Sequence, residues 1–98
     1  VGDGSEFASY RKQIDDIDDA LMRLIAKRME VSREIGELKR EKGLAVFQPF
    51  RYNETMRRCD DYCMDTKLDA GTMKGIFEVI HSESVRQQLD IVNDGIVE

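Results

Sequence analysis

A heptad repeat of apolar residues dominates the first half of the chain. It advances in alternating steps of four and three residues, the spacing that places side chains along one stripe of an α-helix. Its members are Tyr10, Ile14, Ile17, Leu21, Leu24, Arg28, Val31, Ile35 and Leu38. Gly43 and Pro49 then disfavour continuation of the helix. The sequence therefore predicts one long N-terminal helix whose apolar seam contains a single cation, Arg28.

Two shorter helices are predicted after this one. The second runs from about Pro49 to about Asp65, and its apolar stripe consists of Tyr52, Met56, Cys59 and Cys63. The third begins after Asp69, which is a favourable N-cap residue. Its stripe consists of Met73, Phe77, Ile80, Ser84, Gln88 and Ile91. No strand pattern competes, so the predicted fold class is all-α with three helices per chain.

The length of the first helix bears on assembly. About 34 helical residues span about 50 Å, whereas a compact monomer of this size has a diameter of about 33 Å. Two short helices cannot cover an apolar seam of that length, so the sequence predicts an intertwined homodimeric helical bundle. We expect the helical domain to occupy residues 8–92. Residues 1–7 are interpreted as a linker remnant or an expression scar, and residues 93–98 as a C-terminal tail.

Charge and composition exclude several classes of function. The formal net charge of -5 repels nucleic acid and anionic membrane surfaces. The sequence contains neither a membrane-spanning stretch nor a signal-peptide pattern, and so we expect a cytoplasmic protein. With Cys59, Cys63 and the single His81, the chain has too few soft ligands for a zinc site. We expect no metal, and we expect both thiols to be reduced and partly buried.

Polar residues interrupt the apolar stripes of the first and third helices. Arg28, Ser32, Ile35 and Lys39 share one stripe, and Ser84 and Gln88 share another. Buried cations need a counter-ion, and these stripes contain no acid, so a small anionic ligand would complete them. Alternatively, Arg28 extends to solvent or meets an acid from a neighbouring helix, and Ser84 and Gln88 fix the helix register. Gly36 indicates a close approach by a neighbouring backbone or ligand.

Three segments carry a recognisable set of motifs: YRKQIDDIDDALMRLIAKRMEVSREIGELK (10–39), VFQPFR (46–51) and LDAGTMKGIFEVIHSESVRQQ (68–88). They contain an early arginine, an I-D-x-x-L turn, A-x-R and I-G-x-x-K steps, a loop arginine and a closing S-V-x-x-Q. In this combination the chain resembles the all-helical class of chorismate mutases, which are intertwined dimers of three-helix protomers. The resemblance implies an isomerase of the shikimate pathway that converts chorismate to prephenate in aromatic amino acid biosynthesis.

The resemblance also implies roles for individual residues. Arg11, Arg28 and Arg51 would bind the two carboxylates of the substrate, Lys39 and Gln88 would contact its ether oxygen, and Ser84 would support them. Arg11 would come from the partner chain, because about 25 Å of helix separates it from Arg28. The chain departs from the family pattern at Gln48 and Tyr52, where acids are common. These two positions would handle the substrate hydroxyl, although Tyr52 is equally well placed to pack in the core.

The implied reaction is a unimolecular Claisen rearrangement, which needs no nucleophile, metal or cofactor. Cations would restrict the dianion, and donors would meet the negative charge that grows on the ether oxygen. Two alternatives stay open. One is an isochorismate pyruvate-lyase on the same fold. The other is a non-catalytic dimerisation or effector-sensing module, fused to another shikimate or aromatic pathway enzyme.

Overall fold

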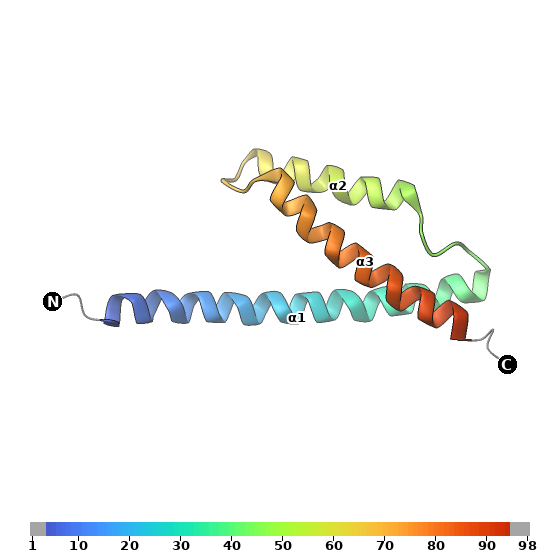
Figure 1. Ribbon diagram of the computed structural model, residues 1–98, viewed down its shortest axis with the longest axis horizontal. Helices are drawn as coiled ribbons and strands as arrows, with labels where there is room; N and C mark the ends of the chain where they lie inside the picture. The colour runs from blue at the N-terminus through green and yellow to red at the C-terminus, as the bar shows by residue number, and fades with distance from the viewer. Residues whose placement is uncertain (1–3, 95–98) are drawn as a thin grey trace. The chain divides into compact units, whose positions relative to one another are not determined.

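The computed structural model describes residues 4–94, which form three α-helices (Figure 1). They are α1 (Gly4–Lys42), α2 (Pro49–Met64) and α3 (Ala70–Asp94), and α1 is 39 residues long. The all-α prediction and the long N-terminal helix are thereby confirmed. The expected linker begins outside the described residues, but α1 already includes residues 4–7. Within residues 4–94, no helix is long and apolar enough to cross a membrane.

The helix ends follow from local chemistry that the sequence predicts. Gly43 has a φ of +65°, and the amide of the next residue, Leu44, donates to the carbonyl oxygen of Lys39 at 2.9 Å. Glycine is favoured at the first position after a helix because it adopts a positive φ without a steric penalty. At the start of α3, the carboxylate of Asp69 accepts from the Thr72 amide at 2.8 Å. The predicted N-cap is therefore confirmed, and this hydrogen bond lowers the pKa of Asp69.

The chain divides into two compact units, residues 1–30 and 31–98, and each is described by itself. In the first unit, residues 4–30 are the N-terminal part of α1. The apolar repeat along this part is exposed to between 51% and 68% at Tyr10, Ile14, Ile17, Leu21 and Leu24. A stripe of this size is larger than the scattered apolar residues of an ordinary surface. It is therefore a candidate interaction surface.

In the second unit, α2 and α3 pack against each other. Cys59 and Cys63 of α2 are buried free thiols, as expected. Ser84 and Gln88 of α3 are buried as well. The ammonium of Lys74 on α3 also pairs with a carboxylate oxygen of Asp60 on α2 at 3.0 Å. The connection between the two helices, residues 65–69, is short (Figure 1).

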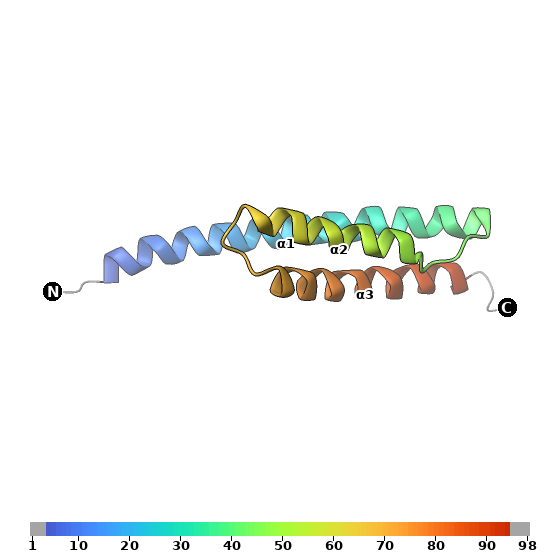
Figure 2. The same ribbon diagram turned by 90° about the horizontal axis from the view of Figure 1, so that it is seen from above.

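The last turns of α1 approach the C-terminal half of α3 very closely (Figure 2). A Cβ atom on Gly36 would lie 3.1 Å from Cγ of Gln88 and 3.3 Å from its Cα. The expected close approach at Gly36 is confirmed. The packed face consists of Ser32, Gly36 and Lys39. Ile35 does not belong to it, because its side chain is 43% exposed, and the predicted stripe is wrong at that position.

We predict that Gly36→Ala lowers the free energy of unfolding by about 1–2 kcal/mol, because its Cβ would push against the backbone of α3. Gly75→Ala is the matched control, since a Cβ at Gly75 in α3 meets nothing within 4 Å. That change should raise the free energy of unfolding by about 0.5–1 kcal/mol. Denaturant titration at one fixed chain concentration measures both. Equal stabilisation by the two alanines would contradict the close approach.

Candidate active site

The ammonium of Lys39 is the centre of the site, and two uncharged oxygens hold it. Its Nζ donates to the carbonyl oxygen of Val46 at 2.6 Å and to Oε1 of Gln88 at 2.9 Å. The side chain is half-buried, and this burial lowers the pKa of Lys39 below its ordinary value. Neutral oxygens satisfy two of the three protons without cancelling the charge. A cation held in this way attracts an anion.

The amide of Gln88 can take only one orientation. Its Nε2 donates to the carbonyl oxygen of Ser32 at 3.0 Å and to the Oγ atom of Ser32 at 2.9 Å. Because a lysine ammonium only donates and a carbonyl oxygen only accepts, Oε1 must face Lys39 and Nε2 must face Ser32. All of these atoms lie in residues 31–94. The structure thus brings together the two residues that the family resemblance assigns to the ether oxygen.

A polar network on the surface fastens α3 to α1 beside this site. The guanidinium of Arg33 donates to Oε1 of Gln87 at 2.9 Å, and Nε2 of Gln87 donates to Glu83 at 2.7 Å. Hydrogen bonds from Arg86 and Gln87 lower the pKa of Glu83 to about 2. The buried Ser84 lies on α3 between these residues, one turn before Gln88. The network therefore holds the segment of α3 that carries both predicted residues.

The beginning of α2 carries the predicted residues Gln48 and Arg51. Gln48 is the N-cap residue, and its carbonyl oxygen accepts from the Tyr52 amide at 3.2 Å. Arg51 lies in the first turn, where its guanidinium is 3.4 Å from a carboxylate oxygen of Glu54. The Arg51 side chain is 64% exposed, and such exposed pairs are weak. Arg51 can therefore exchange this acid for another anion at little cost.

Tyr52 both packs against aromatic rings and forms a polar contact within the chain. Its ring lies 4.7 Å from the His81 ring and 6.1 Å from the Phe47 ring, between centroids. Its hydroxyl donates to Oε1 of Glu78 at 3.1 Å. This hydrogen bond to a carboxylate raises the pKa of Tyr52.

The remaining predicted residues, Arg11 and Arg28, lie in the first unit. The guanidinium carbon of Arg11 lies 5.7 Å from the centroid of the Phe7 ring. Arg28 is half-buried, next to the buried Met29. Lys39, Gln88, Ser84, Gln48, Arg51 and Tyr52 all lie in the second unit. The roles of all eight residues in binding and catalysis stay predictions.

Sequence reasoning did not identify every group that builds the site. Ser32 stands out in the sequence as a polar member of the stripe, but its bond to Gln88 could not be read from spacing. The carbonyl oxygen of Val46 gives no side-chain signal at all. Glu78 lies among exposed positions of α3, and nothing in the sequence links it to Tyr52.

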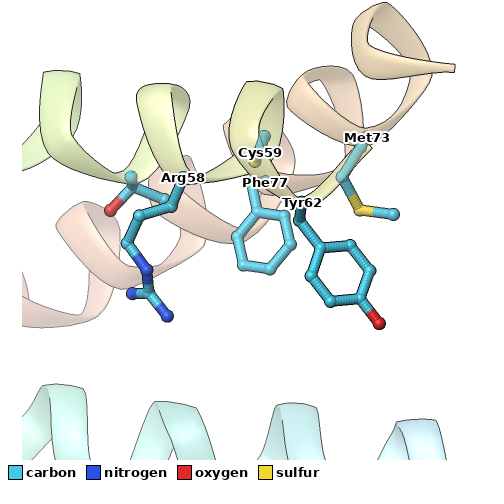
Figure 3. Close-up of a pocket in the computed structure, with 6 residues that line it drawn as sticks. Arg58, Cys59, Tyr62, Met73 and Phe77 are labelled. Carbon is cyan, nitrogen blue, oxygen red and sulfur yellow. The ribbon is translucent and has the colours of Figure 1, made fainter. Parts of the chain in front are cut away.

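A separate groove lies between α2 and α3 (Figure 3). It measures about 270 Å³, and its lining, mostly apolar in surface, consists of Thr55, Arg58, Cys59, Tyr62, Met73 and Phe77. It contains none of the predicted site residues. The groove is therefore distinct from the Lys39 site.

Comparison with known proteins identifies relatives of the chain. A chorismate mutase of Methanocaldococcus jannaschii is 27% identical over 85% of this chain and 86% of its own length. A 3-dehydroquinate dehydratase of Pyrobaculum aerophilum is 34% identical over 79% of this chain but only 22% of its own length. A 4-amino-4-deoxychorismate mutase of Streptomyces pristinaespiralis is 25% identical over 89% of this chain and 67% of its own length.

The sequence model of the family described as chorismate mutase type II matches residues 10–89. This match includes the end of α1 with Lys39, all of α2, and α3 as far as the residue after Gln88. The chain therefore belongs to the chorismate mutase type II family.

Proposed function

We propose that this chorismate mutase type II domain rearranges chorismate to prephenate at the Lys39 site. The observation that carries the proposal is the Lys39 ammonium, which is half-buried, bonded to two neutral oxygens, and adjacent to the oriented amide of Gln88. Chorismate is a dianion, and its ether oxygen gains negative charge as the carbon–oxygen bond breaks. A fixed cation beside that oxygen stabilises the transition state more than the ground state.

The two donors have different parts in this scheme. The third proton of Lys39 is directed to the ether oxygen, while Val46 and Gln88 hold the other two. Gln88 reaches the same oxygen by exchanging its bond to Ser32 Oγ, and the Ser32 carbonyl keeps the amide in orientation. A well-aimed donor typically contributes about 2.7–4 kcal/mol to a reaction of this kind. Together the two donors supply a large share of the barrier reduction.

Three arginines complete the substrate contacts in this proposal. Arg51, in the first turn of α2, binds one carboxylate with help from the positive end of the helix dipole. Arg28 of the same chain and Arg11 of the partner bind the carboxylates as well, and Ser84 supports them. Gln48 and Tyr52 contact the ring hydroxyl. The restriction of the dianion by these groups brings the ends of the forming bond together.

We propose that the assembly is an intertwined homodimer. The exposed apolar stripe of residues 4–30 requires cover along its whole length, and the mostly apolar groove between α2 and α3 requires an occupant. The α1 helix of a second copy satisfies both needs, because it is long and apolar along one stripe. This pairing is also the simplest source of Arg11.

The free thiols Cys59 and Cys63 support the prediction of a cytoplasmic protein.

We propose that the domain is part of a larger enzyme of the same pathway. The related 3-dehydroquinate dehydratase supports this, because the chain matches only 22% of its length. Turnover of chorismate by the isolated chain, followed by ultraviolet absorbance, tests the catalytic proposal directly. Release of pyruvate from isochorismate would instead support the lyase. Absence of turnover of either substrate by a folded chain would support the dimerisation or effector-sensing module.

We predict that Gln88→Glu shifts the profile of kcat/KM towards low pH. An amide donates at any pH, but a carboxyl group donates only when it is protonated. The ionised carboxylate would also face the Ser32 carbonyl oxygen, an acceptor that the amide now satisfies. We expect activity at pH 7 to fall by about 100-fold and to recover partly towards pH 4.5. A profile unchanged between pH 4.5 and 8 would show that Gln88 does not contact the reacting oxygen.

We predict that Arg11→Ala and Arg28→Ala chains, each inactive alone, regain activity when they are mixed. Hybrid dimers would contain one intact site, so random exchange should restore roughly a quarter of the wild-type activity per chain. Mass spectrometry of differently labelled chains measures the exchange independently. Complete exchange without recovery of activity would contradict a site that is shared between chains.

A further inference from the structure

The side-chain amide of Gln88 gives both of its protons to one residue, Ser32 of α1. Nε2 donates to the Ser32 carbonyl oxygen at 3.0 Å and to the Ser32 Oγ atom at 2.9 Å. Ser32 is 5% exposed and Gln88 is 6% exposed, so bulk water hardly competes for either bond. A primary amide has only these two protons to donate. While both bonds to Ser32 persist, Gln88 therefore has no proton left for a ligand.

Only one of the two bonds can be released without moving a helix. The Ser32 carbonyl oxygen belongs to the backbone of α1, whereas Oγ can turn about a single side-chain bond into another staggered position. The amide itself cannot turn, because Oε1 accepts from the Lys39 ammonium at 2.9 Å and a reversed amide would place two donors against each other. The proton that Oγ accepts is thus the one that Gln88 can give to a ligand.

We propose that Ser32 is a positioning residue of the site, and that its hydroxyl oxygen competes with the ether oxygen of the substrate for one proton of Gln88. This inference rests on the proposed function and deepens it. The exchange replaces one hydrogen bond by another, so the reaction gains only the difference between the two acceptors. In the ligand-free chain, the same hydroxyl saves a buried donor from being left without an acceptor. Ser32 therefore stabilises the fold and slows the reaction.

The main test is Ser32→Ala, which removes Oγ and keeps the carbonyl bond that orients the amide. We expect kcat/KM for chorismate to rise about fivefold, because Gln88 then gains a hydrogen bond in the transition state without losing one. Ser82→Ala is the matched control, since Ser82 is an exposed residue of α3. It should leave kcat/KM unchanged, and its Tm reports the helix propensity of alanine. Relative to this control, Ser32→Ala should have the lower Tm.

A second comparison shows whether Ser32 acts through Gln88. Gln88→Met has a side chain of similar length with no proton to donate. In the Gln88→Met background, Ser32→Ala should change kcat/KM less than twofold, because there is no amide proton to compete for. A folded Ser32→Ala chain with wild-type or lower kcat/KM would overturn the inference. A fivefold gain that persists in the Gln88→Met background would overturn it as well.

Nuclear magnetic resonance of the Gln88 side-chain amide separates this inference from the proposed reaction. Where the folded wild-type chain binds chorismate without turning it over, the proposed function fails alone. Bound chorismate should then shift the resonance of the Nε2 proton that Ser32 Oγ holds and leave that of the other proton in place. Two unmoved resonances would overturn the competition at Ser32. Where the wild-type chain does not bind chorismate, both proposals fall.

Discussion

The site depends on one interaction, the contact of the Lys39 ammonium with two oxygens that carry no net charge. A glutamate in place of Gln88 would neutralise the cation and weaken its attraction for an anion. A carbonyl and an amide instead fix its position and leave its charge uncompensated. The free-energy cost of burying that charge appears as the lowered pKa of Lys39. Under the proposed function, a dianion that enters the site recovers this cost.

The geometry of that contact depends in turn on a residue without a side chain. Gly36 allows α3 to approach so closely that Gln88 lies between Ser32 and Lys39 and bonds to both. A glycine in the middle of a helix costs up to about 1 kcal/mol relative to alanine. The missing side chain at Gly36 in turn allows α1 to pack closely on α3. The polar contacts at the site thus depend on the close approach of the α1 and α3 backbones. The chemistry of the side chains alone would not produce them.

The fold could be predicted from the sequence where local rules decide the outcome. Gly43, Pro49 and Asp69 set helix ends through their own backbone and side-chain chemistry, and Gly36 indicated a close contact. The heptad spacing predicted α1 but misassigned Ile35, which is 43% exposed and lies outside the face that packs on α3. Periodicity alone cannot tell which neighbour a stripe will meet.

The site could be predicted only in part, for a related reason. Lys39 and Gln88 stood out because polar groups on apolar stripes need partners. Their actual partners, a hydroxyl at Ser32 and a backbone carbonyl at Val46, come from tertiary contacts that no spacing encodes. Glu78 was invisible because an acid on an exposed helix face is common, and only the three-dimensional arrangement brings it to Tyr52.

The loop between α1 and α2 serves both ends of the site through adjacent residues. The backbone of Val46 anchors the Lys39 cation, while the ring of Phe47 packs against the aromatic rings that position the phenol of Tyr52. The surroundings of the Lys39 ammonium and of the Tyr52 ring therefore depend on one short stretch of main chain. A change in the path of this loop would displace both groups together.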